Sequence, residues 1–119
     1  METLIKEFFE HRISSCRMSQ TRLKEEYRHD EEIFEKIKEN VYDIFRTIYA
    51  SATEKYGADS KEAREFFTDC LTRIPANWTS AYEKAAQHQD TEKMHIERIK
   101  LDTVSDIREA VLTLWRKKI

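Results

Sequence analysis

The sequence predicts an all-α protein, an antiparallel bundle of about four helices that forms a single domain over residues 1–119. The chain of 119 residues contains one glycine and one proline, too few for the tight reversals that β-sheets require. Apolar residues recur at spacings of three and four, which is typical of amphipathic helices. A chain of 14.3 kDa can bury about two-thirds of its surface, which is enough for one core.

The first half of the chain, up to Tyr56, carries one apolar stripe and has neither glycine nor proline. A single helix of that length would be roughly 80 Å long, more than so small a domain can cover, so we expect a break. Asp30 is a good N-cap, because a basic segment precedes it and acidic residues follow it. We therefore expect helices at 3–28 and 31–56. A break within 14–20, where serines weaken helix propensity, is the alternative.

The clearest part of this stripe consists of Phe34, Ile37, Val41, Ile44 and Ile48. Ile33 lies beside it and widens it. Such a stripe predicts a helix with a broad buried face. The regular alternation of three and four is also what the seam of a coiled coil requires.

The second half begins with the turn signals of a helix boundary. Gly57 is the only glycine, and we expect it to end the second helix in a left-handed conformation. Asp59 and Glu62 stand three residues apart, which matches a variant of the capping box. A third helix is therefore expected at 60–88, with a kink at Pro75, because proline removes a backbone donor and clashes with the preceding turn.

The last helix is expected at 91–118, with an apolar stripe formed by Val104, Ile107, Val111 and Leu114. Thr103 and Asp106 match a capping box, which favours a restart of this helix near Asp102. Four helices of similar length with short connections predict an up-down-up-down bundle.

Charge and cysteine content limit the partners and the compartment. The first 56 residues carry 10 basic and 12 acidic side chains, and the remainder carries 11 of each. A nucleic-acid footprint is normally a clustered basic face, so we expect no nucleic-acid partner. No apolar run approaches the roughly 20 residues of a transmembrane segment, and the first residues do not resemble a signal peptide. Cys16 and Cys70 fall on the apolar stripes, so we predict reduced core thiols in a cytoplasmic protein.

One motif could bind metal. Glu26…His29 and Glu92…His95 are two Glu-x-x-His pairs, and such pairs resemble half of the carboxylate-bridged di-metal site of ferritin-like bundles. The chain contains 16 glutamates, so accidental matches are common. The register of the last stripe also turns Glu92 and His95 outward. We therefore favour no metal or other cofactor, and keep the di-metal bundle as a second alternative.

The aromatic residues are more informative. Most of the thirteen lie on the stripes and are expected in the core. Those surplus to one narrow seam are candidates for an exposed groove or a subunit interface, where Tyr and Trp are enriched. These interface candidates are Phe8, Tyr42, Tyr49, Tyr82 and Trp115.

The favoured hypothesis is a non-enzymatic helical interaction protein that acts through an apolar-aromatic face and self-associates, most simply as a two-fold homodimer. No set of side chains converges on catalysis in this sequence. The first alternative is a bundle that binds an apolar ligand or a lipid or granule surface, because Leu4-Ile5-x-x-Phe8-Phe9 is amphipathic. The polar side of that segment is mixed in charge, so its attraction to anionic lipid would be weak.

Overall fold

The computed structural model describes residues 1–117, and four α-helices account for most of them. Their bounds are α1 Glu2–Glu25, α2 His29–Tyr56, α3 Lys61–Gln87 and α4 Thr91–Lys117. No strand occurs among these residues. The predicted all-α helical bundle is confirmed, and the expected helix ends within the described residues are each found within three residues of their predicted positions. The predicted end of the last helix, at residue 118, lies outside the described residues.

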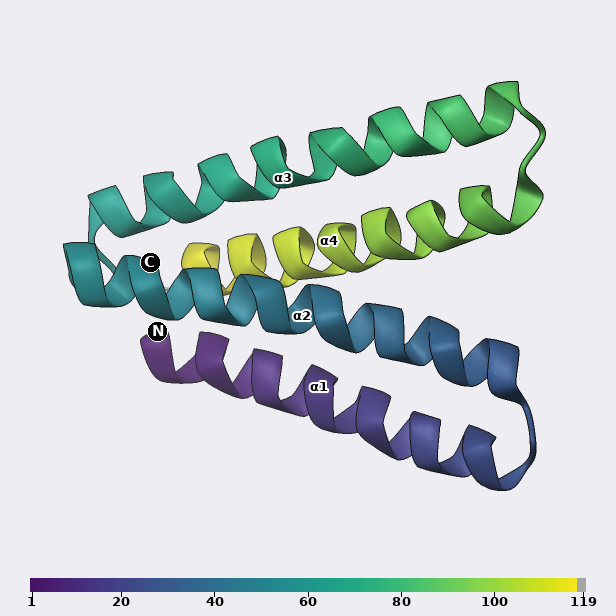
Figure 1. Ribbon diagram of the computed structural model, residues 1–119. Coiled ribbons are helices and arrows are strands. Elements are labelled where there is room, and N and C mark those ends of the chain that lie inside the picture. The colour runs from purple at the N-terminus through teal and green to yellow at the C-terminus, as the bar shows by residue number, and fades with distance from the viewer. Residues whose placement is uncertain (118–119) are drawn as a thin grey trace.

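The helices form two hairpins, α1–α2 and α3–α4, which lie side by side (Figure 1). Helix α2 contacts all three other helices, whereas α1 and α3 do not touch within the described chain. The bundle is therefore a flattened one, with α2 and α4 in the middle and extents of 43 × 35 × 23 Å. Because α2 has only three neighbours and these do not surround it, one side of α2 is left without a helix against it.

An aromatic cluster forms the centre of the core. Phe67 of α3 packs edge-on against Phe45 and Tyr49 of α2 and against Trp115 of α4, with ring centroids 6.2, 5.7 and 6.2 Å apart. Phe9 of α1 joins through Tyr49 at 6.5 Å. Phe9, Phe45 and Phe67 are completely buried. Truncating a buried phenylalanine typically costs about 3–5 kcal/mol, so this cluster holds the two hairpins together.

The first connection shows why α1 ends earlier than expected. The amide of Arg28 donates to the carbonyl of Leu23 at 2.9 Å, and that of Tyr27 donates to Lys24 at 3.1 Å. Tyr27 has a left-handed φ of 58°, so this is a Schellman motif formed without glycine. The expected cap at Asp30 is wrong: α2 begins at His29 and Asp30 lies in its first turn.

The second connection also differs in its cap. Gly57 ends α2 with a positive φ of 94°, but its ψ of 145° is not left-handed helical. The left-handed residue is Asp59, with a φ of 58°. Ser60 and not Asp59 caps α3, because its Oγ accepts from the amide of Ala63 at 3.0 Å. The expected capping box at Asp59 and Glu62 is therefore wrong by one residue.

Helix α4 is continuous, so the restart expected near Asp102 is wrong. The Thr103 hydroxyl donates to the carbonyl of Ile99 at 2.7 Å and so bonds within the helix. The helix is capped at its beginning instead, where Asp90 Oδ1 accepts from the amide of Lys93 at 3.1 Å.

Helix α3 runs through Pro75 without interruption. A proline at this position cannot donate to the carbonyl of Leu71, four residues earlier. A side chain of α4 supplies the missing donor: Arg108 Nη2 lies 2.6 Å from the Leu71 oxygen. The backbone group freed by the proline is thus satisfied across the α3–α4 interface.

This arrangement predicts that Arg108 and Pro75 are energetically coupled. Arg108→Ala should lower the free energy of unfolding by about 1.5 kcal/mol, as is typical of a hydrogen bond with a charged donor. In a Pro75→Ala background the restored amide can donate to Leu71, so the cost should fall by about 1 kcal/mol or more. Urea unfolding of the four proteins measures this coupling. Arg116→Ala, at an exposed arginine, is the control, and an equal cost in both backgrounds would contradict the coupling.

Candidate functional site

The exposed apolar residues identify the surface best suited to a partner. Among the large apolar side chains, Ile33 and Ile44 of α2 are 54% and 40% exposed. Ile37 and Ile48 are half-buried, and Ile48 also packs against the core. Residues spaced by four and seven lie on one side of a helix, so these four side chains form one row. We call Ile33, Ile37, Ile44 and Ile48 the isoleucine face.

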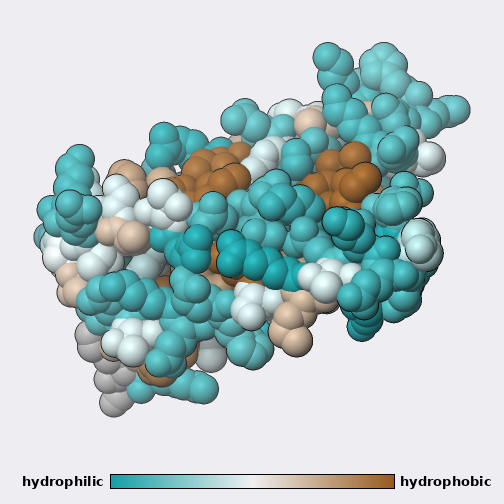
Figure 2. All heavy atoms as spheres, turned by 60° about the horizontal axis from the view of Figure 1, so that its bottom comes forward, coloured by the Kyte–Doolittle hydropathy of each residue, from teal (hydrophilic) through white to brown (hydrophobic). Residues whose placement is uncertain are grey.

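The row is accessible because the neighbours of α2 occupy its other sides. Glu39 is bonded to Arg17 of α1, Tyr42 to Asp106 of α4, and Phe45 packs on Phe67 of α3. Between the isoleucines the same side of the helix carries the uncharged, exposed Asn40. Figure 2 shows one face of the molecule, on which compact apolar patches are separated by hydrophilic side chains.

The structure places the five interface candidates differently from one another. Tyr42 and Tyr49 are buried in the core and are not available to a partner. Phe8 is half-buried and packs on Phe9 and Tyr42. Tyr82 is half-buried and accepts a hydrogen bond from Arg98 at 3.1 Å. None of these four side chains adds to the isoleucine face, which the sequence interpretation assigned to a buried stripe.

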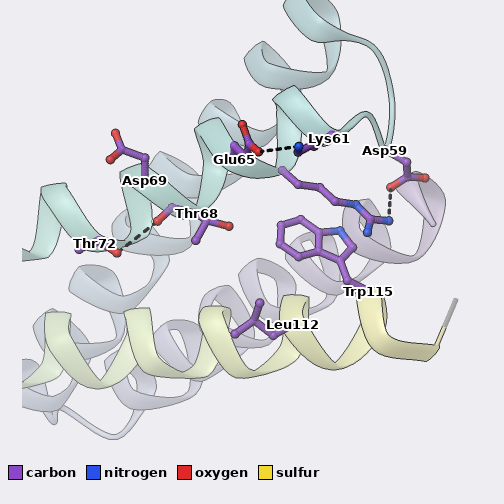
Figure 3. A pocket seen from close by; sticks show the side chains of 9 residues that line it. Asp59, Lys61, Glu65, Thr68, Asp69, Thr72, Leu112 and Trp115 are labelled. Atoms are coloured by element: carbon purple, nitrogen blue, oxygen red, sulfur yellow. Dashed lines mark hydrogen bonds and ion pairs between the residues drawn. The ribbon is translucent and has the colours of Figure 1, made fainter. Parts of the chain in front are cut away.

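Trp115, the fifth candidate, borders a groove of about 890 Å³ between α3 and α4 (Figure 3). The Arg64 guanidinium lies over its indole ring, 5.1 Å from the centroid, and pairs with Asp59 at 3.8 Å. Trp115 Nε1 and Arg64 Nε are buried and lack a hydrogen-bond partner within residues 1–117. The lining mixes Lys61 and Arg64 with acidic side chains, so it does not select a ligand of one charge.

A polar cluster around Asp106 joins α1, α2 and α4. The carboxylate of Asp106 on α4 accepts from Arg12 Nε of α1 at 2.9 Å and from the Tyr42 hydroxyl of α2 at 2.6 Å. The Arg12 guanidinium also lies over the ring of Phe8, 5.0 Å from its centroid. Burial and the hydrogen bond to Asp106 raise the pKa of Tyr42. The Tyr42 phenol therefore stays neutral and donates to Asp106, so its role is to hold α2 against α4.

This cluster predicts a graded loss of stability. Tyr42→Phe removes one hydrogen bond and should lower the free energy of unfolding by about 1–2 kcal/mol. Asp106→Ala should cost about 2–3 kcal/mol: it leaves the Tyr42 hydroxyl without its acceptor, while the partly exposed pair with Arg12 adds less than about 1 kcal/mol. Thermal and urea unfolding measure both effects. Asp102→Ala, at an exposed position one turn earlier on α4, is the matched control, and an equally small effect of Asp106→Ala would overturn the assignment.

The four metal-ligand candidates are exposed, and they do not come together as the ligands of one metal ion. Glu26 is the C-cap of α1 and pairs with Arg28 at 3.0 Å, while His29 begins α2 and faces Glu32 at 3.6 Å. Glu92 is exposed, and His95 packs edge-on against Phe34 with ring centroids 4.5 Å apart. In residues 1–117 no group of three or more His, Cys, Asp or Glu side chains could hold a metal ion.

Among residues 1–117 two side-chain carboxylates are buried, and each is paired with a basic group. Glu39 of α2 accepts from Gln20 at 2.7 Å and from Arg17 at 3.1 Å, both on α1. Burial opposes its ionisation, but these bonds and the charge of Lys36 outweigh it and lower the pKa of Glu39. Glu97 of α4 pairs with Lys100 at 3.3 Å. Its other oxygen lacks a hydrogen-bond partner in the described chain.

The lowered pKa of Glu39 predicts part of the acid sensitivity of the fold. A carboxylate with a lowered folded-state pKa stabilises the protein above its usual value of 4.5, and this contribution is lost as the pH falls through the lowered pKa. Glu39→Gln should therefore lose less stability than wild type between about pH 5 and pH 3. Arg17→Ala, which removes a donor to the same carboxylate, should also flatten the profile. Equal slopes for Glu39→Gln and wild type in pH-dependent urea unfolding would refute this role.

The two cysteines are not suited to nucleophilic chemistry. Both are free and buried. Burial, followed by the charge of Glu35, raises the pKa of Cys16 to about 11, so its reactive thiolate is rare at neutral pH. Cys70 belongs to the core on the side of α3 that faces it, and its thiol lies 3.6 Å from Arg73 Nη2.

Comparisons with known proteins identify no relative, so any proposed function has to be argued from the geometry of this chain. No protein-family model, no curated protein and no solved structure matches the chain. The helices of residues 1–117 include none that combines the length and apolar character needed to cross a membrane.

Proposed function

We propose that this protein is a non-enzymatic helical interaction protein that self-associates. The observation that carries the proposal is the isoleucine face, a row of apolar side chains on α2 in which two members, Ile33 and Ile44, are exposed. Ile33 is more than half exposed and Ile44 is 40% exposed. An uncharged row of this kind is unusual in a chain whose residues are 37% charged, and apolar rows rimmed by polar residues are typical of interaction sites.

The total surface also supports association. A folded monomer of this mass is expected to expose about 6,800 Å², whereas this chain exposes 7690 Å². The excess of about 900 Å² follows from the flattened shape of 43 × 35 × 23 Å, and such a shape offers broad faces for the roughly 800 Å² that one partner buries in a standard interface. The expected cytoplasmic location remains part of this proposal, since two free buried cysteines fit a reducing compartment.

The amphipathic beginning of α1 supports the lipid-binding alternative less well. Ile5 and Phe9 are completely buried in the core, and Phe8 packs on the ring of Tyr42. Only Leu4 of the four apolar residues in this segment is exposed. Insertion into a lipid surface would therefore require these core side chains to leave the bundle.

Sedimentation equilibrium and native mass spectrometry test self-association directly. Wild type at about 100 μM, within the range of weak protein complexes, should have twice the chain mass of 14.3 kDa. The double variant Ile33→Glu with Ile44→Glu should be monomeric, because the charges would be desolvated in the interface. Its helical content should remain that of wild type, since both positions are exposed in the single chain.

The matched control places the same charge on another exposed apolar residue. Met18 of α1 is 71% exposed and is not part of the isoleucine face, so Met18→Glu should leave the dimer intact. A monomeric wild type at this concentration would refute the proposed function. Loss of the dimer in Met18→Glu to the same extent as in the double variant would show that a different surface is used.

A further inference from the structure

We infer that two copies of this chain associate through antiparallel packing of their α2 helices about a two-fold axis that passes between Asn40 and Val41. This inference rests on the proposed function. It specifies that the partner is a second copy of the same chain and how the two copies are arranged. It assigns the contact to one row of side chains on α2.

The spacing of the isoleucines allows an antiparallel contact, and the flanking charges favour it over a parallel one. The intervals between Ile33, Ile37, Ile44 and Ile48 are four, seven and four residues, so the row reads the same in both directions about its midpoint. In a two-fold dimer each surface patch must be complementary to itself. An axis at the midpoint places Ile37 against Ile44 of the second copy. It also places Ile33 against Ile48 of the second copy.

The polar residues along the row obey the same symmetry. Asn40 is exposed and lies next to the proposed axis, where its amide can donate to and accept from Asn40 of the second copy. A polar pair of this kind fixes register in helix–helix contacts. The isoleucine face itself contains no charged residue that would be desolvated by association.

Charges at the edge of the row are complementary under this axis. Lys36 and Asp43 are seven residues apart on one flank of α2, and both are exposed. Within the chain Lys36 pairs with Glu39 and Asp43 with Arg46, and such exposed pairs are weak enough for these side chains to pair across the axis as well. A two-fold axis perpendicular to the antiparallel helices brings equivalent flanks together. Lys36 of each copy then lies within one helical turn of Asp43 of the other, which gives two ion pairs. In a parallel arrangement the equivalent flanks lie on opposite sides of the contact, so Lys36 and Asp43 of the two copies do not meet.

Distances between spin labels on the two copies test this geometry. Thr47 and Glu54 are both exposed residues of α2, and each would be replaced by a labelled cysteine in the full chain. With a helical rise of about 1.5 Å per residue, the antiparallel axis separates the two labels by about 20 Å along the helix at position 47 and about 40 Å at position 54. The parallel arrangement gives equal distances at both positions. Wild type treated with the same reagent measures labelling of the two buried native cysteines.

A charge exchange provides a second, independent readout. Lys36→Asp should weaken the dimer several-fold, because it places two acids together at each end of the contact. Adding Asp43→Lys to that variant should restore the wild-type dissociation constant, since it re-forms both pairs with reversed sign. Both changes are on exposed side chains, so helical content should not change.

The outcomes separate this inference from the proposed function. A dimer whose label distance increases by about 20 Å from position 47 to position 54 supports the antiparallel axis. A dimer with equal distances, or one in which the second charge change fails to restore affinity, would overturn the antiparallel arrangement and leave self-association standing. A protein that is monomeric at all concentrations would overturn both.

Discussion

The arrangement of the bundle depends on one carboxylate that three helices share. Asp106 accepts from Arg12 of α1 and Tyr42 of α2, so it fixes α4 against the first hairpin in both position and register. Directional bonds achieve this where apolar packing alone would allow sliding, because apolar packing is tolerant of alternative arrangements. With α4 held on this side of α2 and α3 held by the aromatic cluster, Ile33 and Ile44 of the isoleucine face stay exposed. Their exposure thus follows from where these contacts place the other helices.

The fold could be predicted because its main determinants are local. Spacings of three and four, the near absence of glycine and proline, and the polar connections specify four helices. The cap residues were harder to predict. Tyr27 and Gln89 take left-handed conformations in Schellman motifs, and this requires backbone hydrogen bonds more than a particular side chain. Thr103 was misassigned because a hydroxyl can bond back within a helix as easily as it can cap one.

The candidate site could not be predicted in the same way. Periodicity shows that Ile33 and Ile44 share a side of a helix, but it does not show whether a neighbour covers that side. Tyr42 and Tyr49 were interface candidates because the buried stripe of this helix was assumed to be too narrow to include them. In the structure α2 contacts three helices and buries a wider arc, which takes in both tyrosines. The regular, uncharged spacing of the four isoleucines is also the pattern of a buried stripe, so only the positions of the neighbouring helices distinguish the two.

The energetics of the core and of the isoleucine face are separable. Phe9, Phe45 and Phe67 are completely buried, and their apolar area already stabilises the single chain. Ile33 and Ile44 retain about half of their surface in water, so each contributes little until a partner covers it. Burial contributes about 1.5–3 kcal/mol for a whole isoleucine, and the two copies together offer four such half-exposed side chains. A gain of a few kcal/mol of this kind must be set against the cost of association, so the dimer should respond strongly to protein concentration while the fold of each chain does not.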